Sequence, residues 1–196
     1  MNDFIVLLEG VSKMKIDKEK LKSAITSLDK SLTSYTLPEW DELPYIDLYM
    51  DQVISILERY FEIYREALGE ENIITASMIN NYVKLGTVPP PVKKRYSRLH
   101  MAYLIIIFSL KQTLDMATIQ KIIPVETEEA DVKKIYNSFV RNQKKIFSYM
   151  MESIKSIAMP VIETNGNNPE KLNDILMQVS SSANICKLLT EKITKI

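Results

Sequence analysis

Apolar residues recur along most of this chain at intervals of three and four positions, the spacing that places them on one face of an α-helix. Long helices of this kind are expected over residues 16–32, 46–68, 132–159 and 169–196. Between residues 97 and 112 the chain is apolar on nearly all sides, which in a soluble protein indicates a helix surrounded by other helices. The pattern therefore predicts an all-α protein, and 196 residues are enough to bury a sizeable core.

Residues that cap or break helices fix the expected ends of these elements. A further short helix is expected over residues 116–123. Hydroxyl or carboxylate side chains stand where this helix and two of the longer ones are expected to begin: Asp17, Ser97 and Asp115. Prolines and a glycine stand beside the other expected boundaries: Pro44, Gly69, Pro124, Pro160 and Pro169.

The charges of the chain are unevenly distributed although they sum to zero. Residues 39–71 hold ten acidic and two basic side chains, whereas residues 72–114 hold six basic and no acidic ones. Five acids of the expected 46–68 helix fall within about 100° of one another around its axis: Asp47, Asp51, Glu58, Glu62 and Glu66. They are expected to form one solvated stripe.

Most classes of enzyme site are excluded by composition. Four glycines are too scattered to build the phosphate-binding loop of a nucleotide enzyme. One histidine, His100, and one cysteine, Cys186, leave no metal cluster and no nucleophile–histidine set. Cys186 lies beside Ile185 and near Leu188, and is expected to be a packed thiol. We expect no catalytic, metal-binding or cofactor-binding residues, so the protein is predicted not to be an enzyme; a site of two inward carboxylates is the remaining alternative.

The sequence also bears on location. No run of about 18 uncharged apolar residues is long enough to span a membrane. The N-terminal segment MNDFIVLLEGVSKMK lacks the small-residue cleavage site of an export signal. We therefore expect a soluble, cytoplasmic protein that does not contact a membrane.

Residues 75–85 are expected to form a short helix with two different faces, capped by Thr75. One face is apolar and is formed by Met78, Ile79, Tyr82 and Val83. The other carries polar side chains at positions i, i+3, i+4 and i+7: Ser77, Asn80, Asn81 and Lys84. Asparagine can bond adenine bidentately in the major groove of DNA, and lysine can reach guanine or phosphate. This polar face suits the reading of base edges.

A basic loop follows this helix. Gly86 stands where a left-handed residue commonly ends a helix, and the prolines at 89–91 stiffen the extended stretch after it. The candidate DNA contacts of the loop and the position after it are Lys93, Lys94, Arg95, Tyr96 and Arg98. Such a loop is typical of a wing laid along a phosphate backbone. The alternative is an ordinary solvated patch of cations.

Together these residues resemble the winged helix-turn-helix of MerR-type transcription regulators. In that family a capped recognition helix ends in tyrosine followed four residues later by glycine, a wing closes on Arg-Tyr-Ser, and an apolar helix follows. The resemblance runs over residues 73–88 and 95–123. A broader stretch, LPEWDELPYIDLYMDQVI with ITASMINNYVKLGTVPPPVKKRYSRLHMAYLIIIFSLKQ, resembles the bacterial domain-of-unknown-function family 1836 (DUF1836) over residues 37–123.

The resemblance implies a regulatory, DNA-binding role and assigns residues to it. The recognition-helix positions fall on Thr75, Ser77, Asn80, Asn81 and Lys84. The wing positions fall on Lys93, Lys94 and Arg95, and the tyrosines that brace the helix against the wing correspond to Tyr82 and Tyr96.

We therefore predict a winged helix-turn-helix, MerR-like DNA-binding domain over residues 38–124, with additional helices at both ends. An N-terminal helical extension covers 1–37, and a C-terminal helical region covers 125–196. Double-stranded DNA is the expected partner, and no small-molecule effector can be assigned. DNA readers of this size generally bind as symmetric dimers, so a homodimer is expected, with the 132–159 helix as core or as dimer interface, and the last helix sharing in that interface.

Three alternatives stay open from the sequence. The rival function is a helical protein–protein interaction module that docks a basic partner through its acidic stripe. His100 is either a packing residue or a phosphate-facing donor, and packing is favoured. Trp40 is expected to plug one end of the core, with a ligand cage as the less favoured role.

Overall fold

The computed structural model describes residues 17–69, 73–123, 128–163 and 169–195. Their elements, in chain order, are α2 (Lys18–Ser34), η1 (Trp40–Glu42), α3 (Met50–Tyr60), α4 (Glu62–Leu68), α5 (Ala76–Lys84), α6 (Arg98–Lys111), α7 (Met116–Ile122), α8 (Glu129–Glu163) and α9 (Pro169–Ile193). Within these residues the only extended pairings are two isolated β-bridges, so the all-α prediction is confirmed. The expected helix ends at 16 and 196, the boundary at Pro124 and the stretch 164–168 lie outside the described residues.

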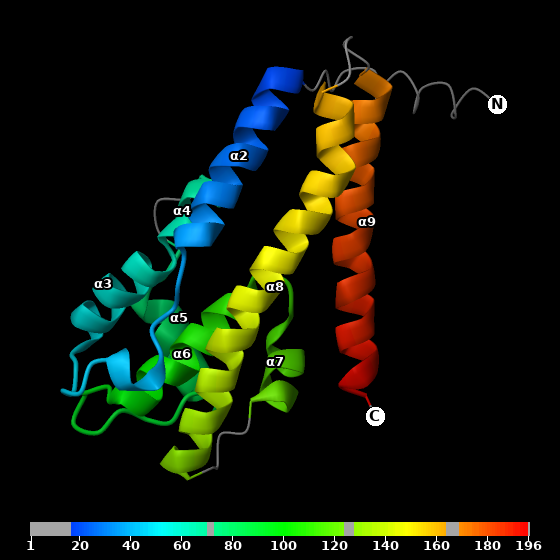
Figure 1. Ribbon diagram of the computed structural model, residues 1–196. Coiled ribbons are helices and arrows are strands. Elements are labelled where there is room, and N and C mark those ends of the chain that lie inside the picture. The colour runs from blue at the N-terminus through cyan, green and yellow to red at the C-terminus, as the bar shows by residue number, and fades with distance from the viewer. Residues whose placement is uncertain (1–16, 70–72, 124–127, 164–168, 196) are drawn as a thin grey trace.

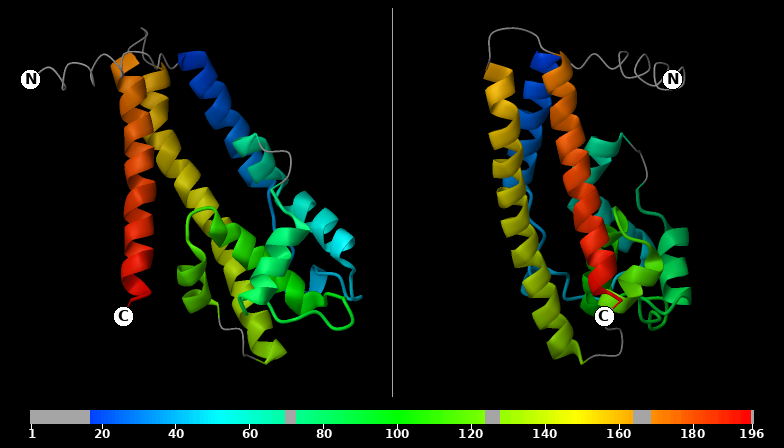
Figure 2. Two further views of the ribbon diagram at one scale, coloured as in Figure 1. Left: turned by 180° about the vertical axis from the view of Figure 1, so that it is seen from behind. Right: turned by 90° about the vertical axis from the view of Figure 1, so that its right-hand side faces the viewer.

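The 35-residue helix α8 is the spine of the molecule (Figure 1). At 1.5 Å per residue it is about 52 Å long. Its N-terminal half packs on α6 and η1, and its C-terminal half packs on α2 and α9. The structure thus has a compact lower part built from η1 to α7 and an upper part of three long helices, which Figure 2 shows from two further sides.

Helix α6 is the centre of the larger hydrophobic core. Every residue from 100 to 108 is buried, so the helix is surrounded by its neighbours as its pattern predicted. Ser97 caps its first turn together with His100. Around it pack the rings of Phe61, Tyr82 and Tyr136. This core holds α5 and the loop after it in place.

The expected helix over 46–68 is wrong in two respects. It begins only at Met50, because Leu48 and Tyr96 exchange two backbone hydrogen bonds (2.9 and 2.8 Å) that keep the preceding segment extended. It also breaks at Phe61, which leaves helical geometry (φ −108°, ψ 17°) while its ring stays buried in the core. Asp47 therefore lies outside any helix, and the predicted acidic stripe is not one helical face. Gly69 ends α4 in the left-handed conformation, as expected (φ 68°).

Helix α8 corrects a second boundary. Pro160 was expected to end it, yet the helix continues to Glu163 with the proline inside. Proline removes one backbone hydrogen bond of a helix. The flanking residues Ala158 and Ile162 are buried in the small cluster shared with α2 and α9, so tertiary packing holds this last turn in helical form.

Two further predictions concern single residues. Asp17 caps α2, with its Oδ1 accepting the amides of Glu19 and Lys20 at 2.8 and 3.1 Å. Cys186, expected to be packed, is exposed, because among the described residues none outside α9 covers the C-terminal half of that helix. A search of the described helices finds none long and apolar enough to cross a membrane.

Candidate nucleic-acid interface

Helix α5 presents the polar face that its sequence predicts. Thr75 caps it, its Oγ1 accepting the amide of Met78 at 3.3 Å. Ile79 and Tyr82 are 0% and 3% exposed and fix the helix on the core, with the Tyr82 ring edge-on to Phe108 at 5.6 Å. The four polar side chains on the other face are all at least partly exposed: Ser77, Asn80, Asn81 and Lys84. The helix is therefore anchored on one side and free to meet a ligand on the other.

The C-terminal end of α5 is clamped by a residue that sequence reasoning missed. Gly86 takes the left-handed conformation (φ 70°) and turns the chain, as predicted. Gln120 of α7 then donates from Nε2 to the carbonyl oxygen of Leu85 at 2.9 Å and to Oγ1 of Thr87 at 3.1 Å. An isolated glutamine gives no sequence signal for such a role, because its partners lie more than thirty residues away.

The loop after α5 ends in a tight hairpin turn. Val92 and Arg95 form an antiparallel bridge, closed by a 2.9 Å hydrogen bond from the Arg95 amide to the Val92 carbonyl oxygen. The two residues between them, Lys93 and Lys94, both have positive φ (52° and 64°), the mark of a type I′ turn. Both lysine side chains are exposed. This turn is the tip of the predicted wing.

The end of this loop is anchored by Tyr96. Its backbone pairs with Leu48, and its side chain is 3% exposed, edge-on to the ring of His100 at 5.5 Å. Tyr96 was counted among the candidate contacts. Its burial argues against that contact role, because a buried ring cannot reach a ligand in solution, and is compatible with the bracing role that the resemblance also implies.

Arg95 lies over the ring of Tyr49, which, like Gln120, was not predicted from the sequence. Its guanidinium donates from Nη2 to the hydroxyl of Tyr49 at 3.0 Å, and its Cζ lies 4.9 Å from the centroid of the same ring. Tyr49 is exposed and directly follows Leu48, so the bridge to Tyr96 places it beside the wing. This stacking holds the guanidinium at the surface, where it remains open to solvent.

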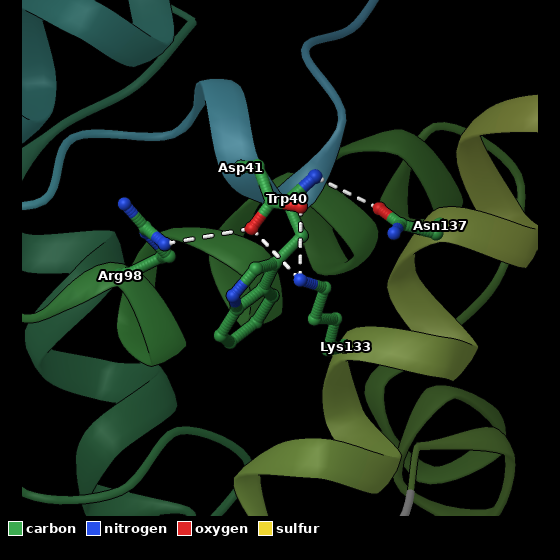
Figure 3. Close-up of polar contacts among 5 residues, drawn as sticks. All are labelled: Trp40, Asp41, Arg98, Lys133 and Asn137. Carbon is green, nitrogen blue, oxygen red and sulfur yellow. Dashed lines mark hydrogen bonds and ion pairs between the residues drawn. The ribbon is translucent and has the colours of Figure 1, made fainter.

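Arg98 is engaged elsewhere, at the junction of η1, α6 and α8 (Figure 3). Its Nη1 lies 3.9 Å from Oδ1 of Asp41, whose carboxylate also accepts two hydrogen bonds from Nζ of Lys133 at 2.8 and 2.9 Å. Beside it, Asn137 of α8 accepts the amide of Trp40 at 2.8 Å. Arg98 was predicted as a contact on the basic face, and the structure points it into this junction.

The remaining candidate cations lie on α5 and on the loop that follows it. Seen from behind, α5 and the loop that follows it lie together on the face turned to the viewer (Figure 2, left). Within the described residues Lys84, Lys93 and Lys94 have no carboxylate within 4.0 Å. Their charge is thus available to an anion.

His100 is buried beneath the loop that follows α5, so the packing interpretation is confirmed. It is 5% exposed, and Nδ1 lies 3.0 Å from the Ser97 amide, which can only donate. Nδ1 therefore accepts, and Nε2 carries the hydrogen and points at the carbonyl oxygen of Pro90, 3.4 Å away. Burial lowers the pKa of His100, against smaller raising effects of the Pro90 carbonyl and the Asp47 carboxylate.

This lowered pKa predicts a loss of stability in mild acid. Below about pH 6.5 the unfolded chain binds a proton that the folded chain resists, so unfolding becomes easier as the pH falls toward the pKa of the folded state. His100 is the only histidine, so His100→Gln should flatten this pH dependence. Urea unfolding of both proteins between about pH 5.5 and pH 7.5, on either side of the ordinary histidine pKa, measures it. Equal pH dependence in the two would contradict a neutral, buried imidazole.

A family model described as a domain of unknown function, DUF1836, matches residues 38–139. The chain belongs to the DUF1836 family. The matched part of this DUF1836 protein begins just before Trp40 and ends within α8, so it contains α5, the loop that follows it and the junction of Asp41, Arg98 and Lys133. No curated protein and no solved structure matches the chain.

Proposed function

We propose that this DUF1836 protein is a transcription regulator that binds double-stranded DNA through a MerR-like winged helix-turn-helix. In this proposal α5 enters the major groove and the 89–96 loop follows the backbone. One observation carries it: Lys93 and Lys94 occupy both left-handed positions of a hairpin turn, where asparagine and glycine are preferred. Two lysines at these strained positions are best explained if their charges bind an anionic ligand.

The chemistry of the two elements supports separate roles. On α5, Asn80 and Asn81 can each bond an adenine edge bidentately, and Lys84 can reach guanine or phosphate. On the wing, Lys93, Lys94 and the stacked Arg95 suit phosphate oxygens, which fix position and carry most of the salt-dependent affinity. Tyr96 and Arg98 are left out of the contact set, because one is buried and the other is paired with Asp41.

We further propose that the protein binds as a homodimer in the bacterial cytoplasm. A two-fold dimer presents two copies of α5 to successive major grooves, doubles the number of phosphates bound and fixes the spacing of the half-sites. The helices outside the central domain, α2 and the long pair α8 and α9, are free to set that spacing.

A gel-shift titration against the upstream DNA of the protein's own gene tests the proposal. Four cations per copy in a dimer give a slope of about −7 for log affinity against log salt. Lys93→Ala plus Lys94→Ala should reduce the slope to about −4, since the dimer then has about four fewer cations to neutralise phosphate. Asn80→Ala plus Asn81→Ala should keep the slope and remove the preference for the specific site.

The matched control is Glu58→Gln plus Glu66→Gln, which changes charge on α3 and α4 and should leave DNA affinity equal or slightly higher. The same variant also tests the rival function. If the unmodified chain binds a basic partner protein and this variant does not, the result would favour a protein–protein interaction module. The absence of salt-dependent DNA binding in the unmodified protein would refute the proposed function.

A further inference from the structure

The C-terminal half of α9 carries an apolar stripe that no other residue described in the structure covers. Positions with heptad spacing run along this helix: Ile175, Val179, Ser182, Cys186, Leu189 and Ile193. The first two pack into the cluster shared with α2 and α8. From Ser182 onward the stripe is exposed, and Leu189 and Ile193 are each 58% exposed. One continuous row of positions, here called the α9 seam, is thus packed at its N-terminal end and exposed from Ser182 to its C-terminal end.

The reason is visible in the arrangement of the two longest helices. Helices α8 and α9 touch near their connection and then diverge, so the end of α9 stands clear of α8 (Figure 1; Figure 2, left). Helices in water owe most of their stability to the packing of an apolar face. A helix end that exposes Ile185, Leu188, Leu189 and Ile193 at once lacks that support. Monomeric proteins rarely leave such a patch uncovered.

Helix α8 has a matching exposed stripe on the part that diverges. Ile135, Phe139, Asn142, Ile146 and Tyr149 follow the same four–three spacing. Phe139 is half-buried against the larger core, whereas Ile146 and Tyr149 are 56% and 65% exposed. Its lower end borders an open apolar groove of about 480 Å³ between α6, α7 and α8. Both exposed stripes therefore belong to one α8–α9 hairpin.

We propose that a second copy of this chain covers these stripes, and that the two α8–α9 hairpins form a four-helix bundle around a two-fold axis. Three observations select this occupant. The bare stripe of α9 continues the seam by which the same helix already packs on α8, so it suits a helix of the same kind. None of the six positions of the whole α9 seam carries a charge, which argues against DNA or an acidic peptide. Two stripes on one hairpin are self-complementary, as a two-fold interface requires.

This inference deepens the proposed function, because it names the interface of the dimer that would read two half-sites. It does not depend on DNA for its test. The neutral Asn142 within the α8 stripe would favour one register of packing against the partner's helices.

The mass of the full-length protein in solution, measured by light scattering after gel filtration, tests the interface. At tens of micromolar we expect twice the 22.6 kDa of the chain. Leu189→Glu plus Ile193→Glu should give the single-chain mass, while the exposed control Asn184→Glu, on the opposite side of α9, should stay dimeric. A single-chain mass for the unmodified protein, or a dimer that survives both glutamates, would overturn the proposal.

The unmodified protein offers a second readout in case the double variant does not fold. Cys186 is the only cysteine, is exposed in the single chain, and lies within the proposed seam. Its rate of alkylation by a maleimide should fall at least tenfold between dilute and concentrated protein, because dimerisation covers it. A rate independent of concentration in a sample that dimerises would place the interface elsewhere. Failure to bind DNA with an intact dimer would count against the proposed function alone.

Discussion

Trp40→Ala should destabilise the protein by about 3–5 kcal/mol, the usual cost of removing a buried tryptophan from a core. The indole is 3% exposed and lies edge-on to the ring of Tyr136 at 6.3 Å. Leu37 and Leu43, on either side of it in the chain, are also buried in the same core. Substitution would leave a cavity where η1 joins α8.

The loss of stability should be large because of where the indole lies as well as because of its size. The backbone of Trp40 is held by Asn137, and the next residue, Asp41, links Arg98 of α6 to Lys133 of α8 (Figure 3). These surface ion pairs contribute little by themselves, since Asp41 is 71% exposed. Their geometry depends on the indole beneath them, so the cavity left by Trp40→Ala should also weaken these polar contacts.

Urea unfolding followed by circular dichroism measures this prediction, because the variant lacks the only tryptophan and fluorescence cannot report on it. Tyr45→Ala is the matched control: Tyr45 lies in the same connection, is 89% exposed, and should change stability by less than about 0.5 kcal/mol. A destabilisation below about 1 kcal/mol for Trp40→Ala would show that the indole is not the plug of this core.

Local chemistry explains which parts of the fold could be predicted. Asp17, Thr75 and Asp115 cap helices because each side chain meets an amide two or three residues away, and such contacts need no knowledge of the rest of the chain. The central position of α6 follows from a helix without a polar face. Gly69 and Gly86 take positive φ where a glycine ends a helix, which is again a local preference.

The errors come from contacts between distant parts of the chain. The start of α3 is set by Leu48, whose partner Tyr96 is 48 positions away, and no periodicity along one segment could reveal that pairing. Pro160 is retained inside α8 by packing with α2 and α9. Cys186 is exposed because α9 leans away from α8, an angle that its own sequence does not encode.

The candidate site divides in the same way. The exposed face of α5 follows from helical spacing, so Asn80, Asn81 and Lys84 lie where they were expected. Arg98 could not be placed, because a cation next to a basic loop has no local signal that Asp41, far back in the chain, engages it. Tyr49 escaped notice for the same reason, since its guanidinium partner Arg95 is 46 positions away.

Replacing the wing tip by Lys93→Asn plus Lys94→Gly should make the protein more stable and its DNA binding much weaker. The type I′ turn needs positive φ at both central residues, and Asn-Gly is the pair that adopts it most readily. A side chain with a Cβ in the left-handed region costs about 1–2 kcal/mol per residue. Glycine at 94 (φ 64°) removes that cost, and asparagine at 93 (φ 52°) tolerates the left-handed region because its side chain hydrogen-bonds locally. The free energy of unfolding should therefore rise by about 1–2 kcal/mol.

The same change removes two cations per copy from the proposed phosphate-binding set. A dimer with about four fewer cations against phosphate should bind DNA roughly 10²–10³-fold more weakly at physiological salt, because fewer counterions are released. Lys93→Arg plus Lys94→Arg is the control that keeps both charges and the strain, and it should retain DNA affinity and stability. Urea unfolding and the salt-dependent gel-shift on the same preparations measure the two effects. A rise in stability together with a fall in DNA affinity would show that the two lysines serve binding at the expense of stability. If they served the fold alone, the change would raise stability and leave the affinity for DNA unchanged.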